Sequence, residues 1–379
     1  MSVIVMNVIL LLIGINVCAW VILGVKQKAN THSSTPYKYR GYEKSLEAVY
    51  PNFTVEQIDR VCKDTRRLHM QYEPFLQHRE APFKSEFVNV DKRGFRITKD
   101  QAEFPPDSKH VNVFVFGGST AFGYGVVDGD TIASGLQDYL RRTRGIQVNV
   151  YNFGRAHYAS TQEKLLFEQL VLAGQIPNIA VFIDGLNEFV HYDGNLAFTN
   201  VLQKFFESGD IPPERKILLR LPISKLLIPD RAYRLSLWED LPNPNQGVEN
   251  GPTERNLSKA LDRYLANKGR IEKLAKEFGV KTLFVWQPVP VYNYDMTHHL
   301  FVRYDYEGSY PQVKAGYTIA AKRLKDGGLS GNFFWAADMQ ANSKEPLYVS
   351  AFHYSPKMSA DIAQSIGAQL VDRMAISRP

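Results

Sequence analysis

The sequence predicts an α/β fold in which a parallel sheet is covered by helices on both faces. Short apolar runs rich in Val, Ile and Phe alternate with longer segments whose apolar residues recur at helical spacing. Strands that alternate with helices are joined by crossover connections, and such connections build parallel sheets. We expect five strands, at residues 111–116, 147–152, 179–184, 281–286 and 333–336.

Helices are expected between these strands and before them. Thr54 and Gln57 have capping-box spacing at the start of one candidate, and Ser160 and Glu163 have the same spacing in another. The last candidate has Met358, Ile362, Ile366 and Leu370 on one stripe. The expected helices cover residues 54–68, 131–142, 160–173, 257–278 and 356–374.

Residues 2–25 contain no charged side chain, which predicts a transmembrane helix, since about 20 apolar residues cross a bilayer core. A cleaved signal peptide is the rival interpretation. It is disfavoured because no basic residue precedes the run and no small-x-small cleavage site follows it. The basic residues Lys26, Lys28, Lys38 and Arg40 follow the run, and the positive-inside rule would keep the main domain in the cytoplasm.

The chain of 379 residues is 44% hydrophobic, a composition that excludes intrinsic disorder. We expect a linker and accessory segment at 26–105 and a main domain at 106–379, with a proline-rich insertion at about 194–253. The two cysteines, Cys18 and Cys62, cannot form a structural disulfide, because the first lies in the expected membrane helix. The net charge of +6 is scattered, and no nucleic-acid-binding motif accompanies it.

Residues suited to nucleophilic catalysis follow several of the expected strands. Ser119 comes after Gly117-Gly118 at the end of the first strand, Gly154 follows the second, Asn187 follows the third, and His353 precedes the last helix. A parallel sheet brings these positions to one edge. We expect Ser119 to be the nucleophile and His353 its base, and we expect the N–H groups of Ser119 and Gly154 and the Asn187 amide to form an oxyanion hole.

Four segments of the chain resemble the four ordered sequence blocks of the SGNH hydrolases, also called GDSL esterases and lipases. These segments are Gly117-Gly118-Ser119-Thr120, Gly154, Gly185-x-Asn187-Glu188 and His353. The resemblance covers roughly residues 70–375. It implies a flavodoxin-like three-layer fold, and ester hydrolysis or acyl transfer without a metal or organic cofactor. The chain resembles a bacterial, membrane-anchored branch of this family in three features. These are the GGST sequence at 117–120, residues 88–96 and the N-terminal apolar helix.

One position departs from the family pattern. The family usually has Asp three residues before the histidine, and this chain has Ser350. The aspartate orients the imidazole and stabilises its charged form. Three interpretations are open. Ser350 orients His353 without supplying charge, another carboxylate such as Asp338 completes a triad, or the chemistry has been lost.

The resemblance implies a serine esterase that forms an acyl-enzyme and acts on O-acyl esters, acetyl esters above all, of a carbohydrate or envelope polymer. An O-acyltransferase that passes the acyl group to a polysaccharide is one alternative, with a membrane-embedded acyltransferase as its partner. A non-catalytic scaffold of a membrane complex is the other. We expect a single-pass protein of the bacterial inner membrane whose catalytic domain is extracytoplasmic, with no nucleic-acid partner.

Overall fold

The computed structural model describes residues 3–30, 46–66, 68–199, 202, 221–223, 252–301, 311–327 and 331–374. The chain divides into two units, residues 1–37 with 197–249 and residues 38–196 with 250–379. Most of the predicted insertion at 194–253 and of the predicted linker lies outside the described residues. The domain boundaries expected from the sequence therefore stay a prediction.

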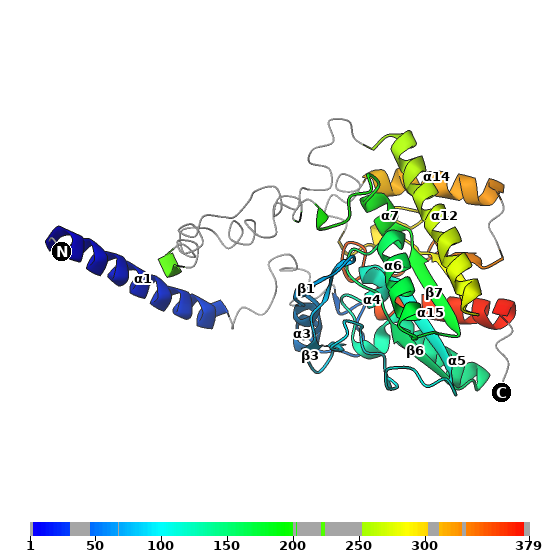
Figure 1. The fold of residues 1–379 in the computed structure, drawn as a ribbon, viewed down its shortest axis with the longest axis horizontal. Helices are drawn as coiled ribbons and strands as arrows, with labels where there is room; N and C mark the ends of the chain where they lie inside the picture. Colours follow the sequence, from blue (N-terminus) through cyan, green and yellow to red (C-terminus); the bar gives the residue numbers. More distant parts are fainter. Residues whose placement is uncertain are drawn as a thin grey trace. The chain divides into compact units, whose positions relative to one another are not determined.

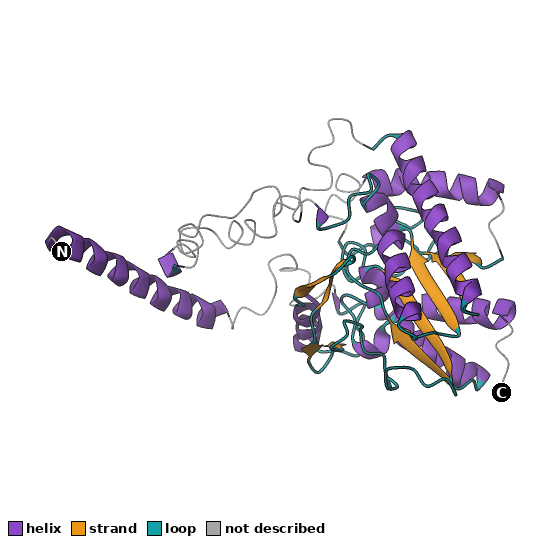
Figure 2. Cartoon of the chain, in the orientation of Figure 1, coloured by secondary structure: helices purple, strands orange, loops and turns teal. Residues whose placement is uncertain are grey.

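The second unit contains a parallel sheet that has five strands among the described residues (Figure 2). Its strand order is β6-β5-β7-β8-β9, which is the flavodoxin-like order 2-1-3-4-5. The predicted fold class and all five predicted strands are thus confirmed, with ends that shift by at most one residue. The strands are β5 Val111–Gly117, β6 Val148–Asn152, β7 Ile179–Asp184, β8 Lys281–Trp286 and β9 Phe333–Trp335.

Alternating strand residues form two different cores. Val113 and Val115 pack in a cluster with aliphatic side chains of α5 (Ile132–Arg144) and α15 (Pro356–Met374). On the opposite face the rings of Phe116 and Phe182 stack with centroids 4.8 Å apart. That face is covered by α6 (Ser160–Leu172), α12 (Glu254–Glu277) and α14 (Pro311–Gly327) (Figure 1). The result is the three-layer arrangement that the resemblance implies.

The predicted helices are confirmed, but one predicted cap is wrong. Helix α3 (Val55–Arg66) begins with the expected capping box, in which Thr54 N donates to Gln57 Oε1 at 2.9 Å and Gln57 N donates to Thr54 Oγ1 at 3.3 Å. Ser160 and Glu163 form no such box. The N–H of Ser160 donates instead to Glu188 Oε1 at 2.6 Å, because α6 begins beside the loop after β7. Helix α14 was not expected from the sequence.

The accessory segment forms two small antiparallel hairpins next to α3. Strand β1 (Met70–Glu73) pairs with β2 (Gln77–Glu80), and β3 (Phe83–Lys84) pairs with β4 (Asn89–Val90). A tight turn at 91–94 follows, and Arg96 then bridges to Asn152 at the end of β6. The accessory segment is thereby attached to the edge strand of the main sheet.

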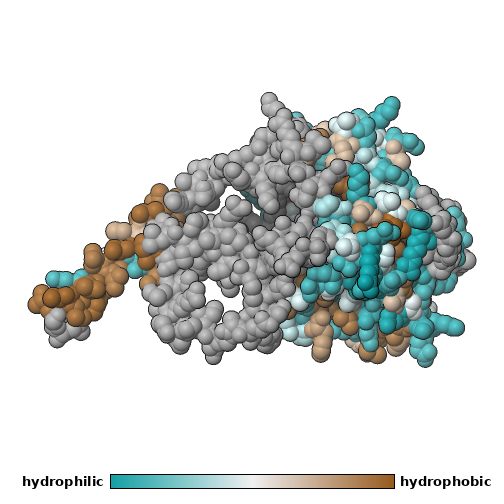
Figure 3. Space-filling view, turned by 90° about the horizontal axis from the view of Figure 1, so that it is seen from above, coloured by the Kyte–Doolittle hydropathy of each residue, from teal (hydrophilic) through white to brown (hydrophobic). Residues whose placement is uncertain are grey.

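Helix α1 (Val3–Asn30) contains the expected apolar run. Residues 3–23 have a mean hydropathy of 2.5 and a length sufficient to cross a membrane, and Figure 3 shows the hydrophobic surface of this helix in brown. A signal sequence near the N-terminus meets the same two criteria. The helix itself is therefore confirmed, and its role as a membrane anchor stays a prediction.

Candidate active site

Ser119 lies where the strand order of the sheet reverses. It is the first residue of the short helix α4 (Ser119–Phe122), which follows β5 directly, and β5 lies between β6 and β7. Open α/β sheets bind ligands at this switch point, beyond the carboxyl ends of the strands. As the first residue of a helix, Ser119 has a backbone N–H with no acceptor inside the helix. Its hydroxyl and its N–H are therefore both available to the same carbonyl group of a substrate.

His353 reaches Ser119 from a turn just before α15. A bridge between Tyr348 and Tyr354 closes this turn, and Val349 N donates to His353 O at 2.9 Å. The Nε2 atom of His353 lies 2.9 Å from Ser119 Oγ, although the two residues are 234 positions apart in the sequence. The structure thus brings together the predicted nucleophile and the predicted base.

Ser350 occupies the other side of the imidazole. Its Oγ lies 2.7 Å from His353 Nδ1 and accepts the backbone N–H of His353 at 3.2 Å. His353 Nε2 can accept the Ser119 proton only if the hydrogen of the neutral imidazole is bound to Nδ1. In that tautomer Nδ1–H donates to Ser350 Oγ. Ser350 can therefore fix the useful tautomer, but it brings no negative charge.

Asp338 takes part in a different set of hydrogen bonds. Its Oδ1 accepts from Asn293 Nδ2 at 2.6 Å and its Oδ2 accepts from Trp335 Nε1 at 2.9 Å. Of the three interpretations of the missing aspartate, the geometry therefore favours orientation of His353 by Ser350 over a triad completed by Asp338.

Asn187 lies beside the nucleophile, as expected. It belongs to α7 (Leu186–Val190), which follows β7, and its Nδ2 donates to Tyr158 O at 2.7 Å. A Cβ atom on Gly118 would lie only 2.3 Å from that Nδ2. The absence of a side chain at Gly118 therefore lets the amide approach the backbone next to Ser119, and the second N–H of the amide remains available for a substrate oxygen.

Gly154, whose N–H is a predicted oxyanion donor, has an acceptor for this group within its own loop. Its N–H donates to Asn152 Oδ1 at 3.0 Å, so a substrate oxygen would have to share or replace this hydrogen bond, and the predicted oxyanion role of Gly154 stays a prediction. A Cβ atom on Gly154 would lie 2.4 Å from Phe122 N. The glycine is thus required for close packing of this loop against α4, which positions Ser119 indirectly.

Three carboxyl groups near α7 are buried, and the sequence did not indicate this burial. Glu163, Asp184 and Glu188 are each at most 5% exposed. Burial, and the proximity of the carboxyl groups to one another, raises the pKa of Glu163 and of Asp184 well above the ordinary values. Burial also raises the pKa of Glu188, whose Oε1 fixes the start of α6. Glu188 thus connects the start of α6 to α7, the helix that carries Asn187.

The accessory hairpin also contributes buried polar groups that the sequence did not reveal. Glu80 Oε1 accepts Ala156 N–H at 2.7 Å, and His78 Nε2 lies 2.8 Å from Ala156 O. Burial lowers the pKa of His78 to about 3, so the ring is neutral. Tyr158 OH donates to His78 O at 2.6 Å. Residues 156–158, which support Asn187 through Tyr158, are thus held by the accessory hairpin.

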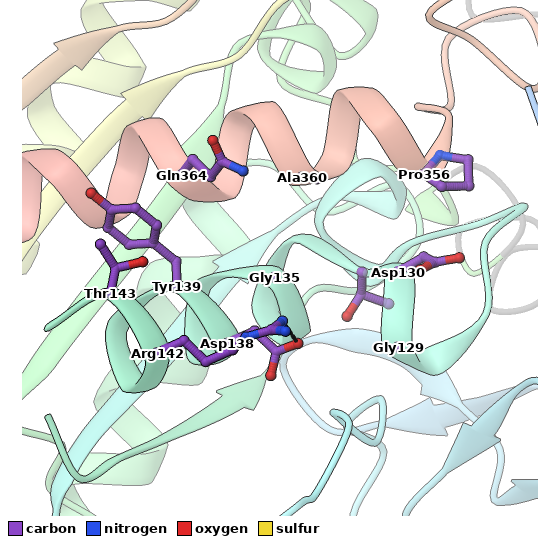
Figure 4. Close-up of a pocket in the computed structure, with 11 residues that line it drawn as sticks. Gly129, Asp130, Gly135, Asp138, Tyr139, Arg142, Thr143, Pro356, Ala360 and Gln364 are labelled. Carbon is purple, nitrogen blue, oxygen red and sulfur yellow. Dashed lines mark hydrogen bonds and ion pairs between the residues drawn. The ribbon is translucent and has the colours of Figure 1, made fainter. Parts of the chain in front are cut away.

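A separate hollow lies between α5 and α15 (Figure 4). Side chains of Asp138, Tyr139 and Gln364 line it, and neither Ser119 nor His353 does. The hollow is therefore not part of the site built from these two residues.

No family model and no curated protein matches this chain. Among solved structures, the chain is similar to a lipolytic protein of the G-D-S-L family from Desulfitobacterium hafniense, with 12% identity and a TM-score of 0.36 over 69% of this chain and 99% of that chain. An acetyl xylan esterase has 11% identity to this chain and a TM-score of 0.38, over 68% of this chain and 98% of that chain. A lipase/acylhydrolase from Enterococcus faecalis has 11% identity to this chain and a TM-score of 0.38, over 69% of this chain and 96% of that chain. At such low similarity, the activity must be argued from this chain's own residues.

Proposed function

We propose that this protein is a serine esterase of the SGNH type. The observation that carries the proposal is the 2.9 Å contact between Ser119 Oγ and His353 Nε2 at the switch point of the sheet. His353 accepts the Ser119 proton as Oγ attacks the acyl carbonyl, and it then donates this proton to the departing alcohol. Water releases the acyl group from Ser119 in a second step, with His353 again as the base.

The negative oxygen that forms in each step needs preorganised donors. The N–H of Ser119 and the side-chain amide of Asn187 supply two of them in this proposal. The Asn187 amide is already oriented by its hydrogen bond to Tyr158 O at 2.7 Å, so little reorganisation accompanies the reaction. Gly154 acts by holding α4 in place.

We propose O-acyl esters of a carbohydrate or envelope polymer as the substrates, with acetyl as the acyl group. The resemblance to SGNH hydrolases supports this class, and the apolar run of α1 suits a protein anchored at a membrane, where such polymers lie. The reaction requires no redox change, because the ester bond is exchanged for a bond to Ser119 and then for a bond to water.

The first test concerns Ser350. Ser350→Asp places an anion three residues before His353, on the turn that already aims the ring, so kcat for acetyl ester hydrolysis should rise by about tenfold or more. Ser350→Ala should lower kcat, because Nδ1 loses its acceptor at 2.7 Å. Turnover of an acetyl ester and of an acetylated polysaccharide by both variants checks this. A rate that Ser350→Asp leaves flat or lowers would contradict the role given to Ser350.

The second test concerns topology. We propose that the main domain is extracytoplasmic, because envelope esters are the proposed substrates, although Lys26, Lys28, Lys38 and Arg40 favour the opposite orientation. Alkaline phosphatase fused to the C-terminus should be active, and a fluorescent protein that folds only in the cytoplasm should be dark. A bright fluorescent fusion with an inactive phosphatase fusion would place the domain in the cytoplasm.

A further inference from the structure

Tyr124 covers one face of the His353 imidazole. The two rings are stacked, with centroids 5.5 Å apart and an interplanar angle of 25°. Ser119 and Ser350 contact the two nitrogen atoms in the plane of the same ring, and the adjacent Phe352 ring is tilted, with its centroid 4.8 Å away. The position beside Nδ1, where the family pattern has a carboxylate, is therefore occupied by the neutral hydroxyl of Ser350.

We propose that Tyr124 is a positioning residue that holds the His353 ring and stabilises its positively charged form in place of the missing carboxylate. This inference rests on the proposed serine esterase function. The face of an aromatic ring carries partial negative charge and attracts a cation placed over it. When His353 takes the Ser119 proton, the charge appears over the Tyr124 ring, so the stacking should strengthen as the transition state forms.

The loop that carries Tyr124 is fixed on both sides of this residue. The guanidinium of Arg96 is fully buried and donates from Nη1 to Gly123 O at 3.0 Å and from Nη2 to Val126 O at 2.8 Å. Tyr50 OH donates to the carbonyl between them, Gly125 O. Every carbonyl that flanks Tyr124 on this loop is thus bound by the accessory segment, so the position of the ring is defined by the fold.

The same loop is pressed against the turn that carries His353. Gly125 has a φ of +87°, and a Cβ atom there would lie 2.5 Å from Val349 Cγ2. Val349 is in turn bound through its N–H to His353 O at 2.9 Å. A residue other than Gly at 125 would separate the two loops. The contact between Tyr124 and His353 therefore depends on a site where only Gly fits.

The far side of Tyr124 is packed by the accessory segment. Its ring lies 5.0 Å from that of Phe122 and joins an apolar cluster with Leu68, Val88 and Val90. Its hydroxyl lies 3.4 Å from Glu80 Oε1. Burial raises the pKa of the Tyr124 hydroxyl well above its ordinary value, so this residue stays a neutral phenol. The ionisable groups at this end are Glu80, a carboxyl whose pKa is raised by burial, and the buried guanidinium of Arg96.

The test is to follow the His353 imidazole by NMR as a function of pH in the full chain labelled at histidine, with His353→Gln used to assign its signal. Tyr124→Leu should move the titration midpoint of His353 to lower pH by about 0.5 to 1.5 units and lower kcat about 2- to 30-fold, as expected for loss of a cation–π contact. Tyr124→Phe should preserve both values approximately. Tyr72→Leu is the matched control, because Tyr72 is 69% exposed.

A second comparison avoids any effect of the smaller side chain on folding. Phenylalanine and pentafluorophenylalanine placed at position 124 have nearly the same shape, but fluorine removes the negative charge from the ring face. The His353 midpoint should fall only in the fluorinated protein. Equal midpoints in these two proteins, or a wild-type midpoint in folded Tyr124→Leu, would overturn the inference.

Ser350→Asp separates this inference from the proposed function. If Tyr124 compensates for the missing anion, Tyr124→Leu should reduce kcat less in the Ser350→Asp background than in the wild type, which is a measurable coupling between the two sites. A wild type without esterase activity would refute the proposed function. The titration shift in Tyr124→Leu would still confirm that Tyr124 stabilises the charged imidazole, and its absence would overturn that claim independently.

Discussion

Ser119→Ala is expected to lower kcat for acetyl esters by about 10⁴- to 10⁶-fold, which is the range seen when the nucleophile of a serine hydrolase is removed. The variant loses the hydroxyl that the structure places 2.9 Å from His353 Nε2. Because a methyl group fits where the hydroxyl was, the fold should be unchanged. The rates of hydrolysis by the two purified proteins, together with their unfolding temperatures, check this expectation.

The control for this variant is Ser108→Ala. Ser108 is exposed and precedes β5, so it lies at the end of the strand opposite to Ser119. The same chemical change at this position should leave kcat at the wild-type value. Hydrolysis by Ser119→Ala at more than a few per cent of the wild-type rate would show that another group is the nucleophile.

Asn187→Ala is expected to lower kcat by about 10²- to 10³-fold with little change in KM, because an oxyanion donor acts mainly on the transition state. The lost hydrogen bond to Tyr158 O should reduce the free energy of unfolding by only about 1 kcal/mol. Steady-state kinetics and chemical denaturation of the variant separate the two effects. Asn342→Ala, at an exposed loop position, is the matched control.

Gly118→Ala tests the same donor without removing it. The added methyl group would lie 2.3 Å from Asn187 Nδ2 and must push the amide away from Ser119. We therefore expect a loss of kcat that approaches the loss in Asn187→Ala, and little further loss when the two changes are combined. A folded Asn187→Ala protein with normal kcat would rule out the oxyanion role of this amide.

The sequence predicted the sheet well because its strands are buried on both faces. Runs such as residues 111–116 and 179–184 are apolar at nearly every position, which is typical of a parallel strand between two helical layers. The crossovers then put Ser119 and Asn187 on the same edge, at the ends of adjacent strands β5 and β7. The location of the candidate site followed from the order of the strands and helices alone.

The sequence could not show contacts that depend on packing between distant segments. Only the structure reveals that Asn152 Oδ1 accepts the N–H of Gly154, the group that the sequence predicts as an oxyanion donor. Glu80 lies in a short polar hairpin strand, and its complete burial against residues 156–158 has no periodic signal. Tyr124 is likewise an aromatic residue in a glycine-rich loop, and the sequence gives no sign that its ring stacks on His353.

The central claim is that Ser119 is an activated nucleophile, and one measurement tests it most directly. The full chain is treated with a fluorophosphonate, which reacts with serine only when a base activates the hydroxyl, and the modified peptide is identified by mass spectrometry. We predict one adduct, on Ser119, that is absent when His353→Ala removes the base. Failure of the folded wild-type protein to react, or an adduct on a different residue, would contradict the assignment of this site.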